Sequence, residues 1–225
     1  HAHYVPPSIL DSVEDRAGDF GLSVVRHPPS CACAFHFNYG LKVRPFFPKL
    51  VEPVAERIDT MSRKGIDRQV LSSWADIFAY GLPREQAQPW HRFLNQHLAD
   101  LCSGHPDRFS MLASVPLPYA DEAAAELDYA VKALGAVGAV VTANVDRQGK
   151  LFARQTVLNI LGIFREMLAK SLGGRTHVKI FVKHQRRGHG MRQLHKMAFP
   201  AFDHRQRAKE LRFGFVTLSR KIVRK

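Results

Sequence analysis

The chain has 225 residues, of which 45% are apolar, so it can bury the core of one sizeable domain, and its composition excludes a disordered protein. It contains neither a continuous apolar run of about 18 residues nor a basic-then-apolar leader, and therefore predicts no membrane span and no secretory signal. The three cysteines, Cys31, Cys33 and Cys102, form no CxxC pair, which favours reduced thiols in a cytoplasmic protein over a structural zinc clamp.

The formal charge of +13 is distributed unevenly along the chain. Residues 1–146 contain 13 Lys/Arg and 17 Asp/Glu, a net of −4, whereas residues 147–225 contain 20 Lys/Arg and 3 Asp/Glu, a net of +17. Phenylalanines are interleaved with the arginines of the basic segment, a pattern that suits phosphate neutralisation and base stacking. Nucleic-acid binding through residues 147–225 is therefore one hypothesis, although no known nucleic-acid-binding module accompanies the segment.

From residue 53 onward, segments with helical periodicity alternate with short apolar segments typical of buried strands. The predicted helices cover residues 53–65, 84–104 and 121–134, and the predicted strands cover residues 67–74, 109–117 and 136–143. Near-continuous Val/Ala strands are buried on both faces, as in parallel sheets covered by helices. The predicted fold class is therefore α/β with right-handed crossovers.

Histidines in the predicted helix 84–104 differ in their expected surroundings. His97 shares a helical face with Leu94 and Leu98, so we expect a buried histidine with a hydrogen-bond partner. His91 is expected at a surface or capping position.

Past residue 150 the alternation continues with a predicted helix at 157–168 and a strand at 177–182, and then loses clarity after His184. Residues 213–218 are a candidate for one more strand. We therefore expect two parts, residues 1–150 and residues 151–225. The second part is a basic continuation that either folds, is partly disordered or results from a shift of reading frame.

The first three residues, His1-Ala2-His3, carry the sharpest chemical signal. Residues i and i+2 of a strand point to the same side, so two imidazoles can converge on one cation. At the carboxyl end of a barrel strand such a pair forms half of a divalent metal site, commonly a zinc site. Two surface histidines or the remnant of a tag are the alternatives.

The surroundings of this motif resemble the amidohydrolase-related family that includes aminocarboxymuconate-semialdehyde decarboxylase. The resemblance covers residues 1 to about 146. Its blocks follow in order: residues 1–7 (HAHYVPP), 57–61 (RIDTM), 65–72 (GIDRQVLS), Asn95 with Leu98-Ala99, 105–109 (HPDRF), 113–117 (ASVPL), Glu126-Leu127 and 134–140.

The resemblance implies a (β/α)8 barrel, of which this chain would supply the first four to five βα units, because a closed barrel typically needs about 250 residues. It also implies a zinc-like divalent cation held by His1 and His3, by a histidine that ends the fifth strand and by an aspartate that ends the eighth. His184 follows a strand-like run and is the candidate for the fifth-strand histidine, although Gln185 stands where the family has proline. The implied reaction is decarboxylation or hydrolysis of a small carboxylic acid, in a homodimer if the full barrel forms.

Three blocks of the family, Gly-Thr-Asp-Tyr-Pro, Ala-His-Gly-Gly and His-Pro-Trp, do not occur after residue 146. We therefore expect the chain to be an inactive fragment of such an enzyme, because a site with too few ligands binds its cation poorly. A frameshift or recombination near residues 146–150 would explain the lost blocks and the charge break together.

Two further residues are candidates for substrate binding. Arg44 lies in a predicted loop where the resemblance implies an arginine that binds the substrate carboxylate, and a planar guanidinium suits that task. Trp74, with Asp76 and Tyr80, follows the second predicted strand at the mouth where barrel active sites assemble. A surface arginine and a packing tryptophan are the alternatives.

Overall fold

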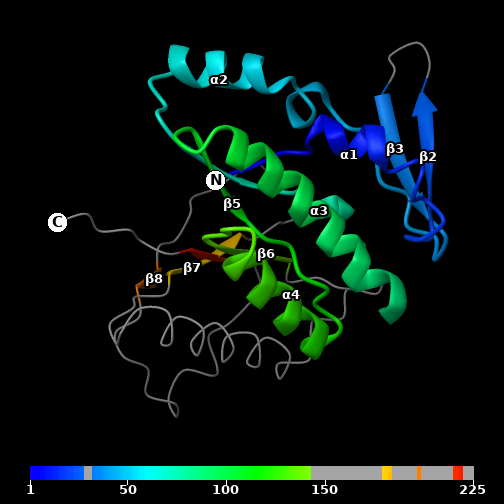
Figure 1. Cartoon of the computed structure of the whole chain (residues 1–225). Coiled ribbons are helices and arrows are strands. Elements are labelled where there is room, and N and C mark those ends of the chain that lie inside the picture. Colours follow the sequence, from blue (N-terminus) through cyan, green and yellow to red (C-terminus); the bar gives the residue numbers. More distant parts are fainter. Residues whose placement is uncertain (28–31, 143–178, 184–196, 199–214, 220–225) are drawn as a thin grey trace.

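The computed structural model describes residues 1–27, 32–142, 179–183, 197–198 and 215–219 (Figure 1). The helices are α1 (Pro7–Ser12), α2 (Val54–Arg63), α3 (Arg84–Gly104) and α4 (Ala120–Lys132), with two 3-10 turns, η1 (Pro48–Leu50) and η2 (Ala75–Ile77). The strands are β1 (Ala2–His3), β2 (Leu22–His27), β3 (Ala32–Phe37), β4 (Gln69–Ser72), β5 (Phe109–Leu112), β6 (Gly138–Val141), β7 (Lys179–Lys183), β8 (Met197–Ala198) and β9 (Phe215–Ser219).

A parallel sheet forms the centre of the N-terminal part. Its strand order is β1-β4-β5, with His3 opposite Ser72 and Leu71 opposite Met111. A single parallel bridge between Ala113 and Ala139 joins β6 to β5. Four neighbouring strands therefore point the same way and end at one edge, as the α/β prediction requires.

The predicted helices 53–65, 84–104 and 121–134 correspond to α2, α3 and α4. Gly65 and Gly135 follow α2 and α4 with φ of 64° and 69°, a left-handed conformation that ends a helix at little cost for glycine. The strands β4 and β5 are shorter than predicted. The apolar residues that follow each of them leave the ladder and form the loops at the carboxyl edge of the sheet.

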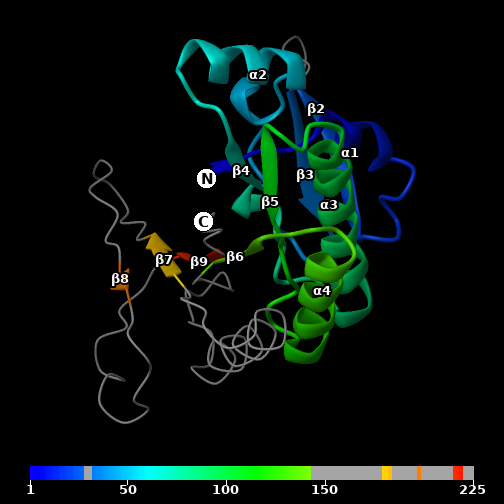
Figure 2. The same cartoon turned by 60° about the vertical axis from the view of Figure 1, so that its left-hand side comes forward.

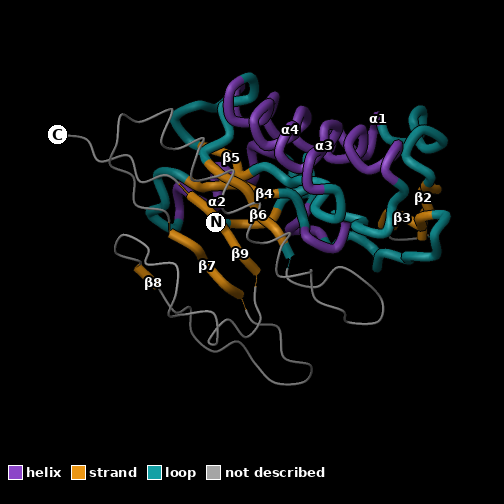
Figure 3. Tube along the Cα trace, turned by 90° about the horizontal axis from the view of Figure 1, so that it is seen from below, coloured by secondary structure: helices purple, strands orange, loops and turns teal. Residues whose placement is uncertain are grey.

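Helix α3 packs on two clusters of apolar side chains. Figure 3 shows α3 and α4 as a layer over the parallel strands. Towards its N-terminus α3 contributes Trp90 and Phe93 to a cluster with Phe20 and Phe35, and towards its C-terminus Leu98 joins the cluster around the sheet. Because one long helix belongs to both clusters, it ties them into one core.

An antiparallel hairpin, β2–β3, stands apart from the parallel sheet in Figure 1 and lies behind β4 and β5 in the turned view of Figure 2. The sequence analysis predicted no strand in this part of the chain. Cys33, Phe35 and Phe37 alternate toward the aromatic cluster, so a period of two was present in the sequence. The segment is short and begins next to Pro28 and Pro29, which masked that signal.

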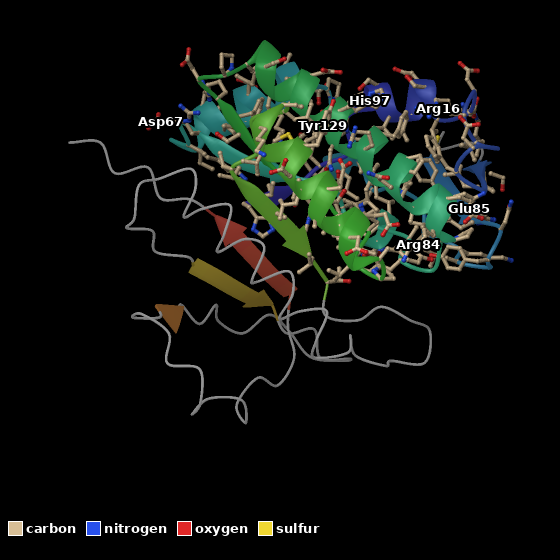
Figure 4. All side chains as sticks on the ribbon, turned by 60° about the horizontal axis from the view of Figure 1, so that its bottom comes forward. Arg16, Asp67, Arg84, Glu85, His97 and Tyr129 are labelled. Carbon is tan, nitrogen blue, oxygen red and sulfur yellow. The ribbon has the colours of Figure 1, made fainter. Side chains whose placement is uncertain are left out.

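The two histidines of α3 differ from their predictions, because His91 is more buried and His97 less buried than expected. His91 is buried, contrary to the prediction of a surface position, and Nδ1 of its ring lies 2.9 Å from Ser114 Oγ. His97 is half-buried beside Ser8, and Figure 4 shows it at the outer surface near Arg16. The reason is that α3 is covered on a second side by α4 and the loop after β5, a contact that the periodicity of a single helix does not reveal.

The strands β6, β9, β7 and β8 form a second sheet in that order, with antiparallel pairing between all neighbours. The predicted strands 177–182 and 213–218 correspond to β7 and β9. In a closed barrel the fifth strand would pair directly with β6, whereas β9 lies between β6 and β7 here. The predicted helix 157–168 and His184 lie outside the described residues.

Cys33 and Cys102 are buried, and Cys31 lies outside the described residues. Among the helices that the structure describes, none combines the length and apolar character that a membrane crossing needs.

Candidate functional site

The two histidines of the HxH motif lie side by side, His1 directly before β1 and His3 within it. Their ring centroids are 5.2 Å apart, and the ring planes are perpendicular. His3 is the last residue of the strand, so it lies at the edge where the parallel strands end. The imidazole of His3, with that of His1 beside it, is thereby brought to the edge at which α/β proteins place functional groups.

Hydrogen bonds fix the His3 ring from the neighbouring strand. Its Nδ1 lies 3.0 Å from Ser72 Oγ and 3.2 Å from the carbonyl oxygen of Ser73. A carbonyl only accepts hydrogen bonds, so the second contact favours a proton on Nδ1 and leaves the lone pair on Nε2. This is the tautomer in which a histidine ligates a metal through Nε2 while a backbone group orients its ring.

The donor set around His3 fits one half of a divalent metal site. Imidazole nitrogens suit zinc and related cations. The hydroxyl of Ser73 is buried and has no hydrogen-bond partner among the described residues, so a polar group from outside them can still pair with it beside His3. In residues 1–27, 32–142 and the three short C-terminal strands, however, no group of three metal-ligating side chains is present, so further ligands would have to come from elsewhere.

Arg44 and Trp74 lie against each other. The Arg44 guanidinium is 4.9 Å from the Trp74 ring centroid, and its Nε donates to Asp76 Oδ2 at 3.1 Å. Trp74 directly follows Ser73, whose carbonyl contacts His3. Arg44 and Trp74 are therefore in contact with each other, and Trp74 is linked to His3 only through the backbone of Ser73.

The side chains of the Arg44–Asp76 ion pair are 65% and 42% exposed. Burial raises the pKa of Asp76, and the Arg44 charge and hydrogen bond oppose that rise. Asp76 occupies only the Nε side of the guanidinium, so the planar fork of its two terminal nitrogens keeps the geometry with which arginine binds a carboxylate. Phe47, 46% exposed, lies edge-on to Trp74 at 5.8 Å between centroids.

Tyr80, predicted near the mouth of the strands, is buried. Its ring stacks on His91 with centroids 5.9 Å apart, and its hydroxyl accepts a hydrogen bond from the Thr142 amide at 3.4 Å. Burial raises its pKa. Tyr80 thus belongs to the core cluster around the parallel sheet and not to the exposed carboxyl edge of its strands.

A buried polar network that sequence analysis missed lies behind Tyr80. Asn95 donates to the Ser114 carbonyl and to Glu126, and accepts from the Ser114 amide. Glu126, fully buried, also accepts from Arg92 at 2.7 Å. The signal in the sequence was Asn95, a polar residue on the apolar face of α3, because a buried amide needs hydrogen-bond partners.

Parallel strands covered by helices, with His3 at the carboxyl end of one of them, place this part of the chain in the class of α/β proteins. The chain belongs to the amidohydrolase family, whose model matches residues 1–203. The match extends past residue 146, where the resemblance was predicted to end. It gives no support to the hypothesis of a nucleic-acid-binding segment.

Several known proteins are similar to this chain. The 2-amino-3-carboxymuconate-6-semialdehyde decarboxylase of Dictyostelium discoideum is 27% identical over 146 residues, which are 65% of this chain and 40% of that protein. The gamma-resorcylate decarboxylase of Rhizobium radiobacter is 36% identical over 93 residues, which are 41% of this chain and 28% of that protein.

Solved structures of decarboxylases also match. The 2,6-dihydroxybenzoate decarboxylase from Rhizobium has 31% identity and a TM-score of 0.47, over 52% of this chain and 38% of that one. The dihydroxybenzoic acid decarboxylase from Polaromonas sp. JS666, with bound manganese, has 25% identity and a TM-score of 0.43, over 51% and 37%. This chain spans 40% or less of the length of the curated relatives named above.

Proposed function

We propose that this chain carries the N-terminal half of the active site of a metal-dependent decarboxylase of the amidohydrolase family. The observation that carries the proposal is the His1–His3 pair at the carboxyl end of a parallel strand, with the His3 ring held through Nδ1. The curated relatives are decarboxylases, which favours carboxy-lyase chemistry over hydrolysis. Hydrolysis of a small carboxylic acid remains the second candidate, because the family also contains hydrolases.

In this proposal His1 and His3 hold a divalent cation, zinc in the first place, together with His184 and a later carboxylate. A cation bound there would act as a Lewis acid on an oxygen of the substrate. Ser73 would use its unpartnered hydroxyl toward a ligand in the same site. His184 lies outside the described residues, so its role rests on sequence alone.

Arg44 and Trp74 are proposed to bind the substrate, a small unsaturated or aromatic carboxylic acid. The terminal nitrogens of Arg44 would donate to both carboxylate oxygens, while Asp76 and the Trp74 face keep the guanidinium plane fixed. The exposed ring of Phe47 beside Trp74 would offer an apolar surface for the rest of the substrate.

We further propose that the chain by itself has no turnover, as an incomplete part of the barrel. This rests on the absence of the three late blocks of the family from residues 147–225. A site with two or three protein ligands leaves the cation partly hydrated and loosely held. A homodimer is proposed only for a complete barrel.

Calorimetric titration of the purified full chain with Zn2+ and with Mn2+ tests the metal site. We expect one-to-one binding in the wild type and its loss in His1→Ala and His3→Ala, because each removes one of two imidazoles from the same edge. His105→Ala serves as the matched control, since His105 contacts Phe109 at the far end of α3 and should leave binding unchanged. Equal binding by all four proteins would refute the metal proposal.

A further inference from the structure

The strand β1, which contains His3 and directly follows His1, forms few hydrogen bonds with the rest of the sheet. β1 consists of two residues, and in the part of the chain that the structure describes it pairs only with β4, through Ala2↔Leu71 and His3↔Ser72. A two-residue strand at a sheet edge forms few ladder hydrogen bonds, so its position depends on the residues that flank it.

Tyr4 is the residue that anchors this strand. Its amide donates to the Ser72 carbonyl at 2.8 Å, and the next amide, that of Val5, donates to Leu50. The Tyr4 side chain is fully buried, and its hydroxyl donates to the Glu52 carbonyl at 2.6 Å. Neighbouring residues of a strand face opposite sides, so Tyr4 fixes β1 from the side away from His3.

A buried ion pair packs against this anchor. Arg57 Nη1 donates to Glu52 Oε1 at 3.0 Å, and both side chains are only 8% exposed. The Arg57 guanidinium lies 4.6 Å from the Tyr4 ring centroid, and its Nε donates to Gln69 Oε1 at 2.8 Å. The second carboxylate oxygen of Glu52 accepts from Lys49 at 2.5 Å.

The contacts of this ion pair converge on both strands that hold His3. Tyr4 is the next residue after His3, and Gln69 begins β4, whose last residue and following carbonyl contact the His3 ring. A buried ion pair contributes little net stability compared with apolar side chains of similar volume, so its best-attested use is to specify a geometry.

We infer that Arg57 and Glu52 are positioning residues which, through Tyr4, hold the His1–His3 pair in the geometry that accepts a divalent cation. The inference rests on the proposed metal site. Neither side chain touches the cation, and both act by fixing the backbone of β1 and the ring of His3, as outer groups do at metal sites.

The test compares two substitutions in the full chain, each of which removes the arginine from an arginine–carboxylate ion pair. Arg57→Met removes the guanidinium between Tyr4 and Glu52. Arg92→Met is the control, because Arg92, 31% exposed, likewise pairs with a buried carboxylate, Glu126, and lies over the Tyr129 ring, and both partners belong to α4. Tyr4→Phe is the mild variant, since it removes only the hydroxyl that bonds Glu52.

Two measurements are made on each protein. Calorimetric titration with Mn2+ gives the Kd, which we expect to rise about tenfold or more in Arg57→Met, by less in Tyr4→Phe, and not in Arg92→Met. Long-range 1H–15N spectra of the metal-free, histidine-labelled chain give the ring tautomer of His3. We expect the Nδ1-protonated form in the wild type and in Arg92→Met, and a mixture of tautomers in the other two.

The outcomes separate the two proposals. If the wild type binds no cation, the proposed metal site fails, and the His3 tautomer alone then decides the positioning role. The inference is overturned if Arg57→Met and Tyr4→Phe keep the wild-type tautomer and Kd. It is equally overturned if Arg92→Met weakens Mn2+ as much as Arg57→Met does, because the effect would then be general loss of stability. If Arg57→Met does not fold, Tyr4→Phe carries the comparison.

Discussion

His91 is a titratable residue that the fold holds in its neutral form. Its ring is buried between Tyr80 and Ser114, and burial lowers its pKa to about 3, against a smaller opposing effect of a hydrogen bond with the Phe78 backbone. The unfolded chain binds a proton near pH 6.5, its ordinary pKa, whereas the folded chain does not. The stability from His91 is therefore complete above pH 6.5 and decreases as the pH falls toward 3.

We expect the free energy of unfolding to fall by up to about 1.4 kcal/mol per pH unit between pH 6.5 and about 3 because of this residue. His91→Gln keeps a polar side chain beside Ser114 without a titrating proton. Urea denaturation across this pH range should therefore give a shallower dependence for the variant than for the wild type. Carboxylates titrate in both proteins, so only the difference between the two slopes is informative, and identical slopes would contradict the assignment.

At the scale of elements, α3 joins the β2–β3 hairpin to the parallel sheet. Trp90 is fully buried, and its ring centroid lies within 6 Å of the ring centroids of four phenylalanines, Phe20, Phe35, Phe37 and Phe93. Its Nε1 donates a hydrogen bond to the Ile77 carbonyl at 2.8 Å. A hairpin alone is marginally stable in water, so its order depends on these contacts with the helix.

Trp90→Ala is expected to destabilise the chain by about 3–5 kcal/mol, because it removes a large side chain from a packed cluster and leaves a cavity. Trp90→Phe retains most of the volume and loses the hydrogen bond to Ile77, so a cost of about 1–2 kcal/mol is expected. Urea denaturation followed by far-ultraviolet circular dichroism measures both. A cost for Trp90→Ala no larger than that of Trp90→Phe would show that the hairpin does not depend on this packing.

At the scale of the whole molecule, charge and strand direction change in the same part of the chain. Residues 1–146 carry a net charge of −4 and residues 147–225 a net charge of +17. The strands β1, β4, β5 and β6 are parallel to one another, whereas β6 pairs with the later strands in an antiparallel manner. These two changes fit the hypothesis that the reading frame is broken near residues 146–150.

This hypothesis predicts what the coding nucleotides contain. If the frame is broken there, another frame beyond codon 146 should encode the late histidine and aspartate blocks of the family, and restoring it should restore the missing ligands. Sequencing the gene and its transcript is the measurement. Alternative frames without those blocks would rule the frameshift out, and the match of the family to residue 203 would then describe a divergent member.

The sequence by itself determined the α/β class, the three main helices with their ends, and the proximity of the His1 and His3 rings. These features follow from local patterns: the helical period, terminal glycines and the i, i+2 geometry of a strand. Arg44 and Trp74 were also predicted from the sequence, but their contact across 30 positions was not.

Only the tertiary structure decided which groups meet. The burial of His91, the network of Asn95 with Glu126, the ion pair that packs on Tyr4 and the β2–β3 hairpin all join residues from different elements. The physical reason is that periodicity describes one element, whereas the partner of a buried polar group is set by the element packed against it.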